Sequence, residues 1–170
     1  MEDILILSED GKTLLGVKNK DVREVVIPDG VEIIENNAFL FCVSLSRVYI
    51  PNSVRIIGNA FGGCSSLKII DVALENSNYI SINGILFSKD LSYLVKIPEG
   101  INLVEYSIPD TVKDIGKAAF ESCSLLKNVY IPNSVNCIGE FAFDCCSSLE
   151  CIDIPDSVTS IGGHAFRNCI

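Results

Sequence analysis

Eight cysteines and one histidine are the residues of this 170-residue chain whose types could support disulfide, metal or nucleophile chemistry. Five of the cysteines stand three residues after an Ala-Phe pair, so they recur at a fixed place in a repeating pattern. Neighbouring strands lie about 4.8 Å apart, a spacing that a disulfide tolerates. Buried cysteine usually packs as a small apolar side chain, however, which favours a column of free thiols. This column contains Cys42, Cys64, Cys123, Cys146 and Cys169.

The other three cysteines, Cys137, Cys145 and Cys151, lie outside that column. Zinc sites need four converging ligands and often use C-x-x-C pairs, but the segment DCCSSLEC provides no such pair. The only histidine, His164, belongs to the next repeat. We therefore expect no metal, and three partly exposed thiols whose redox state the sequence leaves open.

Catalytic groups are equally sparse. His164 precedes an Ala-Phe pair, in a slot that neighbouring repeats fill with Ala118 and Phe141, so we expect it to face solvent without a nucleophile beside it. Asp71 and Asp153 share one sheet position but lie several repeats apart, roughly 15–25 Å at about 4.8 Å per strand, too far for a glycosidase pair. The sequence predicts neither an enzyme nor a cofactor.

The repeat that positions these residues is about 23 residues long. Ile-Pro begins five units, a valine follows four residues after the isoleucine, and a second isoleucine follows three residues later. The second unit is one residue shorter before its Ala-Phe pair. The five Ile-Pro pairs begin at Ile27, Ile50, Ile108, Ile131 and Ile154.

A short run of alternating apolar residues closes each unit, as in LSRVYIP and LKNVYIP. Such alternation predicts a strand, and the proline after it ends the pairing because it has no amide hydrogen. One strand per unit, always in the same direction, stacks into a parallel sheet. Within the irregular stretch between Val72 and Ile108, Asn83-Gly84 predicts a β-hairpin, and the N-terminus resembles a second copy of this insert.

The expected organisation is a single solenoid over residues 1–170, because one coil cannot bury enough apolar surface alone. We divide it into a hairpin cap (1–26), two coils (27–71), a hairpin insert (72–107) and three coils (108–170), the last incomplete. Its C-terminal edge carries no polar cap, which predicts either a fragment or self-association through that edge.

The units IPNSVRIIGNAFGGCSSLKII and IPDTVKDIGKAAFESCSLLKNVY resemble the BspA-like leucine-rich repeats, whose units read approximately IPxSVxxIGxxAFxxCxxLxxI. The resemblance covers residues 22–70 and 103–170. It implies a right-handed leucine-rich repeat solenoid, mainly of β-structure with short turns or helical segments and a parallel sheet along one face. It also implies a role in adhesion and protein binding at the cell surface, and export in many relatives.

The net charge and the hydropathy of the chain limit the partners it could bind and the cellular locations it could have. The net charge is −9, so nucleic acid and anionic membranes would meet net repulsion. No run of about 18 apolar residues could span a bilayer. The opening MEDILILSED has the wrong polarity for a signal peptide, so we expect either a cytoplasmic protein or a chain that begins after a removed signal.

The exposed row of the sheet is the candidate binding surface. Its outward positions vary along the chain while the inward positions repeat, which is how a solenoid carries an individual recognition surface. Tyrosine is a frequent anchor in interfaces, so Tyr49 and Tyr130 are the leading contacts. The row contains Val26, Tyr49, Asp71, Ser107, Tyr130 and Asp153, with Lys96 added from the insert, and is flanked by Arg47, Lys68, Lys127 and Glu150.

This surface predicts a non-enzymatic binding or adhesion module for a host or matrix protein, or for a surface glycan. The alternative is a structural spacer or stalk within a larger surface protein.

Overall fold

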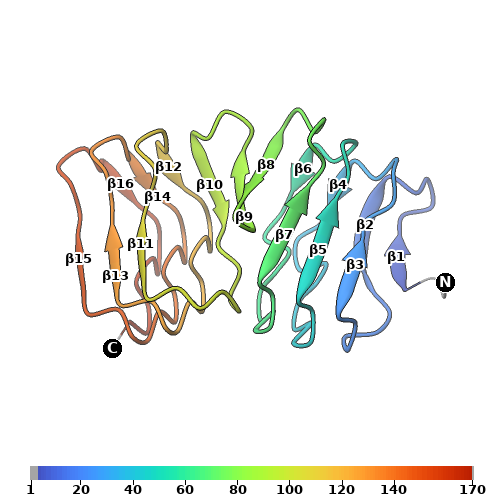
Figure 1. The fold of residues 1–170 in the computed structure, drawn as a ribbon, viewed down its shortest axis with the longest axis horizontal. Helices are drawn as coiled ribbons and strands as arrows, with labels where there is room; N and C mark the ends of the chain where they lie inside the picture. The colour runs from blue at the N-terminus through green and yellow to red at the C-terminus, as the bar shows by residue number, and fades with distance from the viewer. Residues whose placement is uncertain (1–3, 170) are drawn as a thin grey trace.

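The computed structural model describes residues 4–169, which wind into a solenoid of stacked coils (Figure 1). Sixteen strands and the turns between them build these residues, and none of them belongs to a helix. The first and last coils lie at opposite ends of the long axis. The expected repeat solenoid is therefore confirmed, with turns in every place where the resemblance allowed a short helical segment.

Two parallel sheets of three strands each, which we call the front sheets, face the viewer in Figure 1. Their register joins residues one coil apart: Val48 lies between Val25 and Ile70, and Val129 lies between Tyr106 and Ile152. Each inward residue therefore stacks on its counterpart, as the alternation predicts. The first front sheet contains β3 (Glu24–Val26), β5 (Arg47–Ile50) and β7 (Ile69–Val72), and the second contains β11 (Glu105–Ser107), β13 (Asn128–Tyr130) and β15 (Cys151–Asp153).

The opposite side carries two further sheets, the back sheets, where the sequence predicted only recurring inward isoleucines. Each coil adds a strand of two residues whose second member is buried in the inner coils, as for Ile34 and Ile138. Two residues are too few to show an alternating pattern, so the sequence gives no sign of these strands. The first back sheet contains β1 (Leu5–Leu7), β2 (Thr13–Val17), β4 (Ile33–Ile34) and β6 (Ile56–Ile57); the second contains β8 (Tyr79–Ile82), β9 (Ile85–Ser88), β10 (Tyr93–Lys96), β12 (Asp114–Ile115), β14 (Cys137–Ile138) and β16 (Ser160–Ile161).

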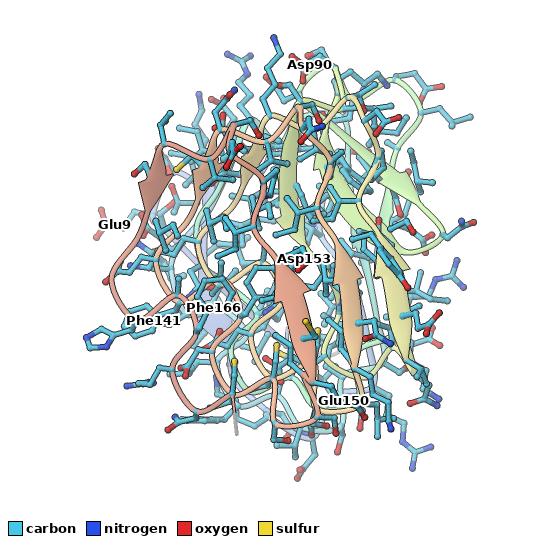
Figure 2. The ribbon with its side chains drawn as sticks, turned by 90° about the vertical axis from the view of Figure 1, so that its left-hand side faces the viewer. Glu9, Asp90, Phe141, Glu150, Asp153 and Phe166 are labelled. Atoms are coloured by element: carbon cyan, nitrogen blue, oxygen red, sulfur yellow. The ribbon has the colours of Figure 1, made fainter. Side chains whose placement is uncertain are left out.

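Columns of identical side chains fill the space between the front and back sheets. In the second half of the chain, the ring of Phe143 stacks on Phe120 at a centroid distance of 4.6 Å and on Phe166 at 5.2 Å. Figure 2 looks at the C-terminal end of this stack, where Phe166 is labelled. Such offset stacking adds to the burial of the rings themselves. The repeated letters of the sequence are therefore the core of the fold.

The cysteine column lies beside the phenylalanines. Its members are free thiols, and four of the five are buried. The Sγ atom of Cys64 donates a hydrogen bond to the carbonyl oxygen of Phe39 in the preceding coil at 3.1 Å, and Cys146 makes the same contact with Phe120. Cys169 makes the same contact with Phe143 at 3.0 Å, so three thiols of the column donate to a backbone carbonyl one coil away. The buried members of the column also pack as small apolar groups.

Two hairpins in the chain have the same turn. In the hairpin of β1 and β2, the Ser8 hydroxyl donates to Asp10 at 2.6 Å and accepts from the Thr13 amide at 2.9 Å. In the hairpin of β9 and β10, Ser88 makes the equivalent bonds with Asp90 and Tyr93 at 2.7 and 2.9 Å. The N-terminus is therefore a second copy of part of the insert.

Residues 73–104, between β7 and β11, are called the insert from here on, and their three strands form an antiparallel meander. The predicted hairpin turn lies between β8 and β9, where Asn83 and Gly84 have φ values of 53° and 82°. Side chains of β9 alternate between two cores: Leu86 packs in the N-terminal core, whereas Ile85 and Phe87 pack in the C-terminal core. One strand thus joins the two halves of the molecule.

The insert also covers the edges of the second coil. The Tyr79 hydroxyl accepts a hydrogen bond from the Ile57 amide at 3.1 Å, and the Gly84 carbonyl accepts one from the Ile70 amide at 3.0 Å. Fully buried Asn76 donates bonds of 2.8 and 3.1 Å to two carbonyls of the same coil. Because these groups occupy the edges of β6 and β7, β7 does not pair with β11.

The position of Lys96 corrects the sequence analysis, which placed it on the exposed row. β10 pairs with β12 in a back sheet, and the following Ile97 amide bonds to the Ala119 carbonyl at 2.7 Å, as Phe120 bonds to Ala142. Ile97 therefore takes a place in the phenylalanine column and carries Lys96 inward. Only 4% of the Lys96 side chain is exposed, and its Nζ donates to the Ala118 carbonyl at 3.0 Å.

One turn residue of each long coil adopts the left-handed conformation directly before the Ala-Phe pair. These residues are Asn37, Ala118, Phe141 and His164, with φ between 53° and 62°. The second coil, which is one residue shorter, has none at this place. There the Asn59 amide donates to the Asn36 side chain of the coil before it at 2.9 Å. The shorter turn still leaves Ala60 and Phe61 buried in their columns.

Candidate binding surface

The first candidate patch lies on the outer side of the first front sheet. The register places Tyr49 between Val26 and Asp71, one strand apart on either side. Val26 is 70% exposed and Tyr49 is 38% exposed. The Arg47 Nε atom lies 2.5 Å from the Asp71 carboxylate, which fixes both side chains beside the tyrosine. A hollow of about 240 Å³ opens next to Tyr49 and Val26.

The second candidate patch lies on the second front sheet. Tyr130, 59% exposed, stands between Ser107 on β11 and Asp153 on β15, both of which are exposed. The Lys127 Nζ atom lies 2.8 Å from Glu150 at the start of these strands. Figure 2 shows Asp153 and Glu150 on the coil nearest the viewer.

These two patches are separate surfaces, whereas the sequence treated their residues as one row. The first front sheet ends at β7 and the second begins at β11, with the insert between them (Figure 1). Tyr49 and Asp71 lie together, and Ser107, Tyr130 and Asp153 lie together. Both patches nevertheless present a tyrosine followed one strand later by an aspartate, since the units share one register.

A hollow of about 280 Å³ beside Tyr130 contains residues that the sequence analysis did not assign to a surface for binding. It is lined partly by Ile131 and by exposed Cys151, which lies opposite Asn128 in the sheet. The sequence analysis considered Cys151 only as a thiol. The alternation of β15 could have shown that Cys151 faces outward, because Ile152 faces the core and both of its neighbours therefore face away from it.

The buried cysteines and the histidine lie in different surroundings. Burial raises the pKa of the Cys64 and Cys123 thiols to about 12, so both stay protonated at neutral pH. His164 is exposed on an outer turn and stacks on Phe141 with a centroid distance of 5.2 Å. Among residues 4–169, no three cysteine, histidine or acidic side chains gather where they could hold a metal ion.

A comparison with protein families identifies the repeat. The profile described as "BspA type Leucine rich repeat region" matches residues 17–104 and 99–170, with six copies. The chain belongs to the BspA-type leucine-rich repeat family. None of the curated proteins compared with it matches.

Solved bacterial structures share the fold of this BspA-type chain. A leucine-rich repeat protein from Eubacterium ventriosum is 30% identical, with a TM-score of 0.76 over 86% of the chain. The pneumococcal vaccine antigen PcpA is 26% identical, with a TM-score of 0.71 over 84%. A leucine-rich cell surface protein from Faecalibacterium prausnitzii is 24% identical, with a TM-score of 0.61 over 87%. The chain spans 40%, 47% and 52% of these three proteins, respectively.

No helix that could cross a membrane is found within residues 4–169, where the secondary structure consists of strands and turns.

Proposed function

We propose that this BspA-type solenoid is a non-enzymatic module that binds a protein ligand, such as a host or matrix protein, through the two patches of its front sheets. One observation carries the proposal. Inward residues of the front strands repeat from coil to coil, while their outward neighbours change between apolar, aromatic, hydroxyl and acidic types. Outward residues that are free of the core can be selected for a partner.

Tyr49 and Tyr130 are the proposed anchors. Both side chains are exposed on front strands, and each lies beside a hollow, of about 240 and 280 Å³, that can receive a partner side chain. Tyrosine offers a large contact area with few rotatable bonds, and such residues often dominate binding energies. Arg47, Asp71, Ser107, Lys127 and Asp153 would supply the polar surroundings of the two anchors.

We also propose a location at the cell surface or outside the cell. The likeness to the pneumococcal vaccine antigen, at 26% identity, supports this location, because an antigen is accessible to the host.

A capture experiment with a double variant tests the binding proposal. The protein and its Tyr49→Ala/Tyr130→Ala variant are used to capture ligands from extracellular matrix and from cell lysate, and the Kd of each captured protein is then measured by calorimetry. Loss of two anchors should weaken binding by about 2 kcal/mol or more, roughly 30-fold. The matched control is Thr159→Ala, which changes an exposed residue next to β16 on the back of the solenoid.

Equal affinities of the wild-type protein and the double variant for every captured ligand would reject the patches. Capture from lysate alone would argue against the extracellular location. If no ligand is captured at all, the alternative of a spacer between other domains gains support.

A further inference from the structure

A polar groove lies apart from the hollows of both patches, where the residues that precede the first front strands meet the insert. Its volume is about 580 Å³, within the range of sites that hold small ligands. Residues that precede the front strands form one wall: Arg23 before β3, Ser46 before β5 and Lys68 before β7. Gly100 and Asn102 of the insert form the other wall.

Backbone hydrogen bonds hold the groove in shape. The Ser46 amide donates to the Arg23 carbonyl at 2.7 Å, and the Lys68 amide donates to the Ser46 carbonyl at 3.0 Å. The Gly100 amide donates to the Leu67 carbonyl at 2.7 Å. A Cβ atom on Gly100 would lie 2.6 Å from the backbone of Ser66, so only glycine allows the two walls to approach this closely. The groove is a built feature of the junction between the two halves.

The charges that face the groove are positive. Arg23 and Lys68 are exposed and form no ion pair with any described residue, whereas Arg47 and Lys127 nearby are each paired with a carboxylate. In a chain with a net charge of −9, these two unpaired cations, two rungs apart in one groove, form a local region of positive charge.

Glu99 is the single acidic residue of the lining, and its charge is offset from within. Only 3% of its side chain is exposed, and its carboxylate accepts a hydrogen bond from the Gly63 amide at 2.9 Å and lies 3.9 Å from the Lys96 Nζ atom. An incoming anion therefore meets Arg23 and Lys68 without an exposed carboxylate between them.

Hydroxyl and amide groups supply the rest of the polar lining. Five serines line the groove, and four of their hydroxyls form no hydrogen bond within residues 4–169, while Ser46 donates to the Arg23 carbonyl. Leu125 is the one large apolar side chain of the lining, and no aromatic residue takes part. The serines are Ser44, Ser46, Ser65, Ser66 and Ser124.

We propose that this groove binds an acidic oligosaccharide, with sulfate or carboxylate groups held by Arg23 and Lys68 and sugar hydroxyls held by the serines and Asn102. The two cations stand two strands apart, about 10 Å along the stack, so they can contact separate acidic groups of one chain. An acidic peptide fits this lining less well, because Leu125 is its one large apolar side chain and peptide interfaces usually use several apolar or aromatic anchors.

Calorimetry with a sulfated tetrasaccharide tests the proposal, with a desulfated tetrasaccharide and a tetraglutamate peptide as comparison probes. The protein should bind the sulfated sugar more tightly than either probe, and the affinity should fall as salt rises from 50 to 200 mM. The Arg23→Ser/Lys68→Ser variant should lose tenfold or more in affinity. The control variant Arg55→Ser/Lys113→Ser removes the same amount of positive charge from two exposed residues beside the back sheets. It should leave the affinity for the sulfated sugar unchanged.

The proposal is rejected if the sulfated sugar does not bind or if tetraglutamate binds more tightly. It is also rejected if both double variants lose affinity equally, because that result would indicate general charge attraction. Tyr49→Ala/Tyr130→Ala should bind the sugar as the wild-type protein does. The outcome at the groove is therefore independent of the outcome for protein binding by the two patches.

Discussion

The N-terminal part (residues 4–72) and the C-terminal part (residues 105–169) have cores of the same design but differ in their outward-facing residues. Both contain the same isoleucine, valine, phenylalanine and cysteine columns, in separate cores joined through β9. Outside, the first patch is fixed by an ion pair of Arg47 with a partly buried carboxylate, whereas the second has an exposed lysine pair and a thiol. The difference teaches that the columns determine the fold and leave the outward positions free to vary.

The largest effect expected from this comparison concerns the middle of the longer phenylalanine stack. Phe143 is fully buried between two rings, so Phe143→Ala should reduce the free energy of unfolding by about 3–5 kcal/mol. Phe166 contacts one ring and is only partly buried, so Phe166→Ala should cost roughly half as much. Urea unfolding followed by circular dichroism measures both. If both substitutions reduced the free energy of unfolding equally, stacking within the phenylalanine column would not explain the stability.

A second prediction compares how the buried thiols of the two parts make the stability of the protein depend on pH above pH 9. Burial raises the pKa of Cys64 in the N-terminal part and of Cys123 and Cys146 in the C-terminal part. Between pH 9 and about 12 the unfolded chain ionises these thiols while the folded chain keeps their protons, so stability should fall as pH rises. The loss is about 1.4 kcal/mol per pH unit for each thiol that is fully displaced in pKa.

The slope of stability against pH should therefore depend more on Cys123 and Cys146 together than on Cys64 alone. Urea midpoints between pH 8 and pH 10.5 measure this slope. Cys123→Ala/Cys146→Ala should flatten it more than Cys64→Ala does. A slope that neither variant changes would show that other groups govern the alkaline loss.

The smallest effect concerns the ion pairs that distinguish the patches. The Asp71 side chain is 30% exposed, so a double-mutant cycle of Arg47→Ala and Asp71→Ala should give a coupling of about 0.5–1 kcal/mol that weakens in 1 M salt. The pair of Lys127 and Glu150 has side chains 51% and 61% exposed, and its cycle should give a smaller coupling. A larger coupling for the lysine pair would reverse the ranking.

The sequence predicted the fold where residues recur and failed where they do not. Five Ile-Pro units fixed the register, and Asn83-Gly84 fixed a turn, because both are local signals. The two-residue back strands gave no pattern. The division into cap, coils and insert stays a prediction about domains.

The candidate surface was less accessible to sequence reasoning. Alternation identified Tyr49 and Tyr130 as outward residues, and the structure places both outside. The separation of the patches depends on hydrogen bonds that Tyr79 and Gly84 accept and that Asn76 donates, which are long-range contacts of an irregular segment. The same segment buries Lys96, because its Ile97-Pro98 pair follows a back strand and takes the phenylalanine place.

The short turn of the second coil carries a practical consequence. The turn is one residue shorter before Ala60, yet Ala60 and Phe61 keep their places in the stack. The Asn59 amide instead donates a hydrogen bond to the Asn36 side-chain oxygen of the coil before it. The length of the turn before the Ala-Phe pair can therefore change without changing how the coils stack. A guest peptide grafted before Ala142 or Ala165, beside half-buried Phe141 or exposed His164, would be displayed on the outer turns, with the buried columns beneath it undisturbed.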